Sequence, residues 1–82
     1  MEKRIGAAII LVENKESVEE INSILSRHSD IILGRQGMPL RTKGVSVINL
    51  ILEATPEEIS SLTGRIGRLE GAQVKSVLTK YS

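Results

Sequence analysis

The chain has 82 residues, enough for one domain and too few for two. Its 11 Lys and Arg residues nearly balance its 10 Asp and Glu residues, which argues against a protein that grips nucleic acid or a membrane surface through a broad basic field. The absence of Cys excludes disulfides, thiolate metal sites and Cys nucleophiles, and the lack of a signal-peptide cleavage pattern or a membrane-spanning apolar run predicts a cytoplasmic protein.

The first two predicted elements are a buried strand and an amphipathic helix. Residues Ile5–Val12 form a continuous aliphatic run, whose length and β-branched content favour a strand. After a polar break, apolar residues recur at helical spacing over residues 18–28. Ser17 can open a capping box at the start of this helix with the Glu three residues later, and Asn14 is an equally plausible N-cap.

A second and a third strand follow, joined by a short turn. The second strand begins at Ile31, and Pro39 places it at a sheet edge or ends it in a bulge, because proline cannot donate a ladder hydrogen bond. Residues Arg41–Gly44 form a compact turn. The third strand, Val45–Leu52, is again almost wholly apolar, so we expect it to be buried.

The remaining elements are a helix with a clear start and a more polar last strand. Thr55, Pro56 and a Glu at the third helical position supply a hydroxyl N-cap, the proline favoured in the first turn and the carboxylate of a capping box. The apolar stripe of this helix runs to Leu69, and Gly71 is the predicted C-terminal cap. Residues Gln73–Lys80 form the last strand.

This order of elements predicts a single α+β domain over residues 1–82. The order β-α-β-β-α-β is that of the ferredoxin-like fold, a four-stranded antiparallel sheet with two helices on one face. The first and third strands are central in that fold, and the second and fourth are edges. The sequence agrees, because the second strand carries Pro39 and the fourth carries Lys75 and Lys80, residues that protect edges.

Both central strands are apolar on both faces, which predicts self-association. An antiparallel sheet with one wet face alternates apolar and polar residues. Here Ile9 and Ile10 face opposite ways, and Val47 and Ile51 continue the apolar character on the third strand. Two helices cover only one face, so we expect the other to bind a second copy in a homodimer or homotetramer. These four residues are the candidate interface, and the sequence does not distinguish which face is used.

Three segments carry a family resemblance: Gly34–Pro39, Val47–Leu50 and Leu62–Lys75. In them the chain resembles the proposed iron-only hydrogenase system regulators, small stand-alone ACT-like proteins similar to the C-terminal domain of nickel-responsive repressors. The resemblance implies an ACT-like ferredoxin fold, dimers or tetramers and a role in regulation, and it transfers no ligand or catalytic residue. The nickel repressors place several histidines on the second strand, where this chain has none, so nickel binding is not implied.

Arg35 and Gly37 are the first candidates for binding a ligand. The segment that contains them can form a short, open stretch of backbone with a fixed Arg, whose planar guanidinium suits a carboxylate or a phosphate. The alternative is an edge bulge with an Arg that faces solvent or bridges subunits. The segment is not a phosphate-binding loop, because the Lys-Ser/Thr ending and a following helix are missing.

Gly64 and Gly67 are the second pair of candidates. They lie about one turn apart inside the second helix, where each glycine costs about 1 kcal/mol relative to alanine. Close approach of the neighbouring helix or of another backbone is the preferred reason for them. Entry of a ligand at a subunit interface is the alternative.

The inventory of catalytic side chains is poor. His28, the only histidine, lies near the end of the first helix, where a structural or capping role is favoured and partners for a metal site are missing. No nucleophile, base and acid are grouped by their spacing, so we expect a non-enzymatic protein without a cofactor or metal.

The expected function is an oligomeric regulatory or sensing module that binds a small molecule or a partner protein at a subunit interface. The alternative is a purely structural oligomerisation or adaptor protein without a ligand. Direct DNA binding is not expected, because the net charge is only +1 and both helices need their apolar stripes for the core.

Overall fold

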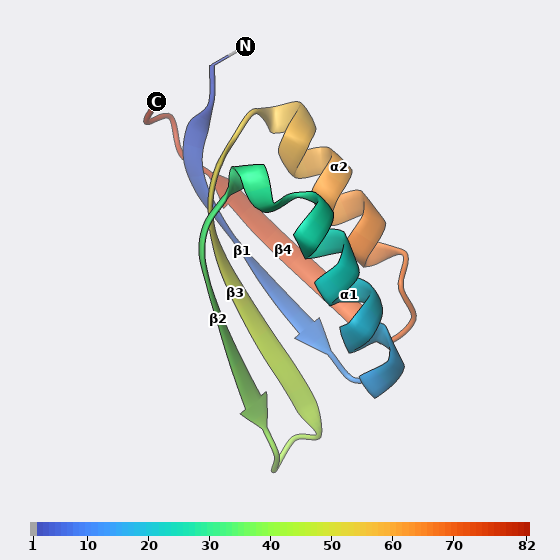
Figure 1. Ribbon diagram of the computed structural model, residues 1–82. Helices are drawn as coiled ribbons and strands as arrows, with labels where there is room; N and C mark the ends of the chain where they lie inside the picture. Colours follow the sequence, from blue (N-terminus) through green and yellow to red (C-terminus); the bar gives the residue numbers. More distant parts are fainter. Residues whose placement is uncertain (1) are drawn as a thin grey trace.

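The computed structural model describes residues 2–82 and confirms the predicted order of elements (Figure 1). The elements are β1 (Arg4–Val12), α1 (Lys15–Arg27), the 3₁₀ helix η1 (Ser29–Ile31), β2 (Ile32–Leu40), β3 (Val45–Ala54), α2 (Pro56–Gly67) and β4 (Ala72–Leu78). The second strand begins one residue later than predicted, because η1 takes up Ile31. No helix among the described residues is both long and apolar enough to cross a membrane.

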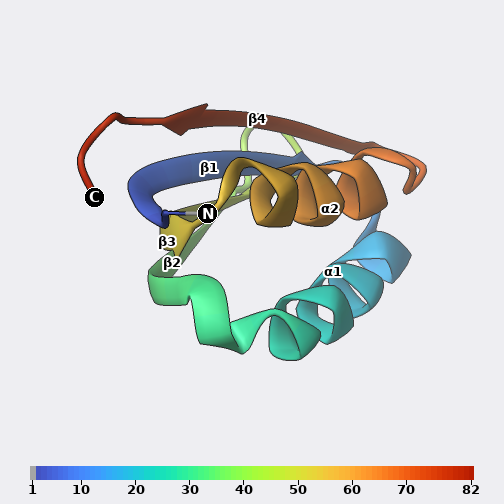
Figure 2. The ribbon, with the colours of Figure 1, turned by 90° about the horizontal axis from the view of Figure 1, so that it is seen from above.

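The strands form one antiparallel sheet in the order β2-β3-β1-β4. The apolar strands β1 and β3 are therefore central and the other two are edges, as the sequence predicts. Figure 2 shows both helices on one side of the sheet, with α2 against β4 and α1 beside α2. The other side, here called the open face, is left uncovered by residues 2–82.

The hydrophobic core fills the space between the helices and the sheet face that they cover. Its fully buried large side chains come from β1, α1, η1, β3 and α2, and they are Ile10, Ile21, Leu25, Ile31, Leu50, Leu52, Leu62 and Ile66. Burying a Leu or Ile side chain contributes about 1.5–3 kcal/mol, so this layer is the main source of stability. The edge strands add only partly buried side chains, which are Ile32 on β2 and Ala72, Val74 and Leu78 on β4.

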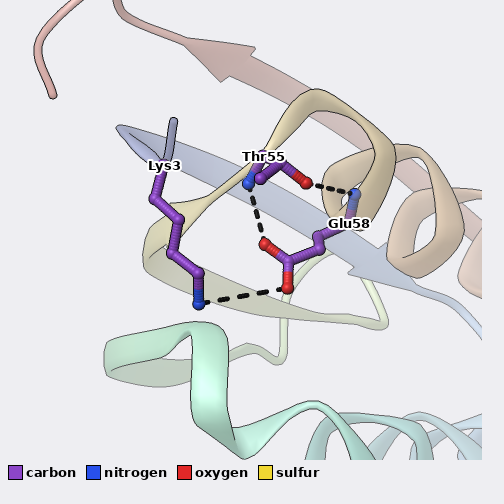
Figure 3. Close-up of polar contacts among 3 residues, drawn as sticks. All are labelled: Lys3, Thr55 and Glu58. Carbon is purple, nitrogen blue, oxygen red and sulfur yellow. Dashed lines mark hydrogen bonds and ion pairs between the residues drawn. The ribbon is translucent and has the colours of Figure 1, made fainter. Parts of the chain in front are cut away.

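The predicted capping box at the start of α2 is confirmed (Figure 3). The Glu58 backbone N–H donates to the Thr55 hydroxyl over 3.2 Å, and the Thr55 backbone N–H donates to Glu58 Oε1 over 2.8 Å. The second carboxylate oxygen of Glu58 lies 4.0 Å from Lys3 Nζ. The box satisfies donors that a helix start otherwise leaves free, and Lys3 adds a contact to the chain before β1.

Of the two predicted N-caps of α1, Asn14 and Ser17, the structure shows Asn14 in this role. Its Oδ1 accepts a hydrogen bond from the Glu16 backbone N–H over 2.9 Å. Ser17 is buried instead, and its hydroxyl donates to the Glu70 carbonyl over 2.7 Å. Ser17 therefore does not cap its own helix and ties α1 to the loop that follows α2.

The second helix ends earlier than predicted, because its last residue is Gly67 and its C-cap is Arg68. Gly71 is not the cap. It lies in the turn before β4 with φ +75°, a left-handed conformation that favours glycine, and a Cβ there would lie 3.0 Å from Asn14 Cβ. The glycine is required by this turn and by its contact with the start of α1.

Candidate functional site

Three rows of side chains cross the open face of the sheet. Residues directly opposite one another on neighbouring strands share a face, so the strand register gives the rows. From β2 to β4 they are Gly34, Ile51, Ala7 and Val77; then Gln36, Asn49, Ile9 and Lys75; then Met38, Val47, Leu11 and Gln73. Two mainly apolar rows therefore flank a more polar middle row.

Large apolar side chains are exposed in every row of this face. Ile9 is 42% exposed, Ile51 49%, Met38 52% and Val77 63%. A shallow hollow of about 220 Å³ lies between β1 and β4, beside Ile9 and Lys75. Contiguous exposed apolar surface of this kind marks interaction sites in proteins.

The structure divides the four candidate interface residues between the two faces. Ile9, Val47 and Ile51 lie on the open face. Ile10 is 0% exposed and belongs to the core beneath the helices. Successive side chains of a strand point to opposite faces, so an interface can include Ile9 or Ile10 but not both. Ile10 is therefore a core residue of the described chain, and an interface on the open face remains a prediction for Ile9, Val47 and Ile51.

A β-bulge in β2 decides which way Arg35 points. The pairing with β3 shifts between Ile32 and Gly34, which leaves Leu33 as an extra residue in the strand. One extra residue reverses the alternation of all the side chains that follow it. Arg35 therefore lies opposite the core residue Leu50, on the helix side of the sheet.

Arg35 lies at one end of a groove between α1 and the edge strand β2. Its Nη2 donates a hydrogen bond to Oδ1 of Asn22 on α1 over 2.8 Å. The groove has a volume of about 220 Å³. Its other lining residues come from α1, β2 and β3 and include Val18, Gly37, Met38, Pro39, Ser46 and Ile48. The helix, the bulged strand and the strand beside it thus form one concave site.

Two features leave this groove open. A Cβ built on Gly37 would have no neighbouring atom within 4 Å, so glycine leaves space here that a side chain would fill. Within residues 2–82 the ion pair found is the one between Lys3 and Glu58, so no carboxylate of the described chain neutralises Arg35. The structure thus brings Arg35 and Gly37, two predicted ligand residues, into one site.

The groove continues towards the β2–β3 hairpin, which extends past α1 in Figure 1. A second hollow of about 200 Å³ shares Val18 and Pro39 with the first. Lys15 and Arg41 line it together with one carboxylate, Glu13. Cationic groups therefore outnumber carboxylates along the whole groove.

Gly64 and Gly67 do not belong to this site, because both lie on the exposed side of α2. A Cβ on Gly64 would meet nothing within 4 Å, and one on Gly67 would be in ordinary contact with Val74 Cγ1 at 3.7 Å. The close approach that was predicted to explain these glycines is absent from the described chain. Nothing in the structure of a single chain explains Gly64.

Gly6 also makes a close approach, to the backbone of β4, and the sequence reasoning missed it. A Cβ at this position of β1 would lie 2.6 Å from the Val77 carbonyl oxygen on β4. The available signal was a glycine inside an otherwise aliphatic strand, which often marks a place where another backbone comes close.

His28 has the predicted capping position. It is the C-cap of α1, and its Nδ1 lies 2.8 Å from the Ile24 carbonyl oxygen, to which a protonated Nδ1 donates. No three His, Cys, Asp or Glu residues cluster as metal ligands within the part of the chain that the structure describes.

Comparison with known proteins identifies both a family and a fold. Residues 4–76 match the TM1266-like family, described as "Iron-only hydrogenase system regulator, putative". The structure of the uncharacterized protein TM1266 from Thermotoga maritima is similar, with a TM-score of 0.91 and 32% sequence identity over 96% of this chain and 100% of that one. No curated protein matches the sequence.

More distant structures share the fold alone. The ACT domain from GTP pyrophosphokinase of Chlorobium tepidum has a TM-score of 0.77 at 15% identity, covering 92% of this chain and 99% of that one. The C-terminal domain of the MgtC protein from Mycobacterium tuberculosis has a TM-score of 0.70 at 10% identity, covering 96% and 89%. The chain therefore has an ACT-like fold.

Proposed function

The chain belongs to the TM1266-like family, and on that premise we propose that it is a non-enzymatic regulatory module of an iron-only hydrogenase system. We further propose that it acts in the cytoplasm as a homodimer or homotetramer joined through the open face of its sheet. The observation that carries the second part is the exposure of Ile9, Ile51, Met38 and Val77 on that face.

The charges on the open face favour a second copy of the chain as its binding partner. Among the described residues of the four strands, the open face carries one cation, Lys75, and one carboxylate, Glu53, which lies opposite Ile5 in the register. A face without net charge can meet its own copy without like-charge repulsion. Two such faces would bury the aliphatic side chains of both copies, which is the usual driving force of obligate homodimers.

The module acts through a partner and not by gripping DNA itself. Both helices bury their apolar stripes against the sheet, so neither is free to enter a major groove. The net charge of +1 offers little neutralisation of phosphates. A gel-shift assay at about 150 mM salt should show no sequence-selective submicromolar complex, and such a complex would promote a direct-repressor function in its place.

The regulatory role is tested in the organism that carries the chain. Deleting the gene should change the level of hydrogenase transcripts or of hydrogenase activity. An Ile9→Lys replacement should reproduce the deletion, because it places a charge in the middle of the open face.

The control is Ser61→Lys, which adds the same charge on the exposed side of α2. It should leave the hydrogenase phenotype unchanged. A deletion without any effect on the hydrogenase system would refute the regulatory role. An Ile9→Lys strain that behaves like the parent, with the variant protein at normal abundance, would refute the role of the open face.

A further inference from the structure

We propose that the groove between α1 and β2 is a binding site for a small organic anion that carries a carboxylate or phosphate at one end and a short apolar chain behind it. The proposal rests on the regulatory function, for which this anion is the signal. If the anion binds, the module is a sensor, and the alternative of a purely structural adaptor protein without a ligand is excluded. The groove lies between α1 and the edge strand β2, and Arg35 and Gly37 enter it from the helix side of the sheet. Met38 and Val47, which the register places on the open face, complete its lining at the sheet edge.

Arg35 is the anchor for the anionic group. A guanidinium has five N–H donors, and one of them is used by the hydrogen bond to Asn22 Oδ1 at 2.8 Å. That bond fixes the direction of the side chain and leaves further donors for a ligand. The planar fork matches the two oxygens of a carboxylate or phosphate, and no carboxylate within residues 2–82 forms an ion pair with it.

The surface behind Arg35 suits an apolar chain. Val18, Pro39 and Ile48 line it with apolar side chains, and Gly37 adds no side chain to it. The volume of about 220 Å³ is roughly that of seven water molecules at about 30 Å³ each. A ligand with a chain of about six carbon atoms therefore fits the groove.

Amide NMR spectra of the isotope-labelled protein can detect such binding residue by residue. Hexanoate supplies both the charge and the chain, hexanol lacks the charge, and acetate lacks the chain. Hexanoate should shift the amide signals of Asn22, Arg35 and Gly37 and saturate in the millimolar range, whereas hexanol and acetate at equal concentration and ionic strength should not. Hexyl phosphate decides between the two anions, because the preferred group should saturate the same signals at lower concentration.

Variants test the two halves of the site. Arg35→Gln should weaken hexanoate binding about tenfold or more, because a hydrogen bond to a charged group is lost, and Arg35→Lys should retain part of the affinity. Gly37→Val should abolish binding by filling the groove. Gly34→Val is its matched control, because it lies on the open face of the same strand and a Cβ there also meets nothing within 4 Å.

The same spectra show whether each variant is folded. The proposal is overturned if hexanol shifts the same amides as strongly as hexanoate, or if Gly37→Val leaves hexanoate binding unchanged. It is also overturned if the shifted signals lie on β1 and β4, which contribute no residue to the groove. None of these results affects the self-association of the chain, which is measured by its mass, so the failure of one proposal is distinguishable from the failure of the other.

Discussion

The two faces of the sheet are built from the same kinds of residue and differ in what covers them. On β1, Ile10 is fully buried and its neighbour Ile9 is exposed; on β3, Leu50 is fully buried and Ile51 is exposed. One step along a strand separates the two environments, because side chains alternate between faces. Aliphatic content alone therefore does not tell the two faces apart, because the topology decides which of them the helices of the same chain cover (Figure 2).

The strongest way to test this comparison is to place the same charge on each face. Ile10→Lys should abolish the folded state, because an unpaired ammonium group in the core costs several kcal/mol, comparable with the total stability of a small domain. Ile9→Lys should keep its helical circular dichroism and a cooperative thermal transition, because its ammonium group reaches water. Equal loss of structure in both variants would contradict the assignment of the faces.

Truncating one apolar side chain on each face should also destabilise the covered face more than the open face, but by less than a buried charge does. Leu50→Ala should lower the free energy of unfolding by about 2–5 kcal/mol through the cavity that it leaves. Ile51→Ala should change it by no more than about 0.5 kcal/mol when association is prevented. Urea denaturation in an Ile9→Lys background measures these free energies of unfolding for the monomer. If Ile51→Ala lowered the free energy of unfolding by more than about 2 kcal/mol, the open face would be part of the monomer core.

Two glycines, one in the sheet and one in a helix that covers it, should respond to alanine in opposite ways. Gly6→Ala should destabilise the fold, because its Cβ would lie 2.6 Å from the Val77 carbonyl oxygen. Gly64→Ala should stabilise it by about 1 kcal/mol, since its Cβ meets nothing and alanine favours the helix. Thermal unfolding of both variants in the Ile9→Lys background shows whether each substitution raises or lowers the stability. A destabilising Gly64→Ala would mean that a contact within the chain still requires the glycine.

The features that sequence reasoning predicted are the ones that local chemistry determines. The capping box of Thr55 and Glu58 depends on residues three apart, and the strand order follows from which runs are wholly apolar. The end of α2 was misplaced because the glycine signal at Gly71 belongs to the next turn, where it contacts Asn14. That contact joins residues distant in sequence and has no local signature.

The candidate site was predicted only in part for the same reason. Arg35 and Gly37 were proposed from the chemistry of their side chains, but the bond from Arg35 to Asn22 depends on a bulge that reverses the strand. Without the extra residue at Leu33, Arg35 would point to the open face and the groove would have no anchor. Gly34, which follows that residue, is the kind of signal that often accompanies a bulge.

In the proposed assembly a second copy of the chain covers the open face. Light scattering coupled to size-exclusion chromatography at micromolar concentration tests it directly, with Ser61→Lys as the control for an added charge on α2. We predict that the parent chain and Ser61→Lys have at least twice the mass of one chain, and that Ile9→Lys elutes as a folded monomer. A parent chain with the mass of a single copy, or an Ile9→Lys variant with the same mass as its parent, would contradict the account.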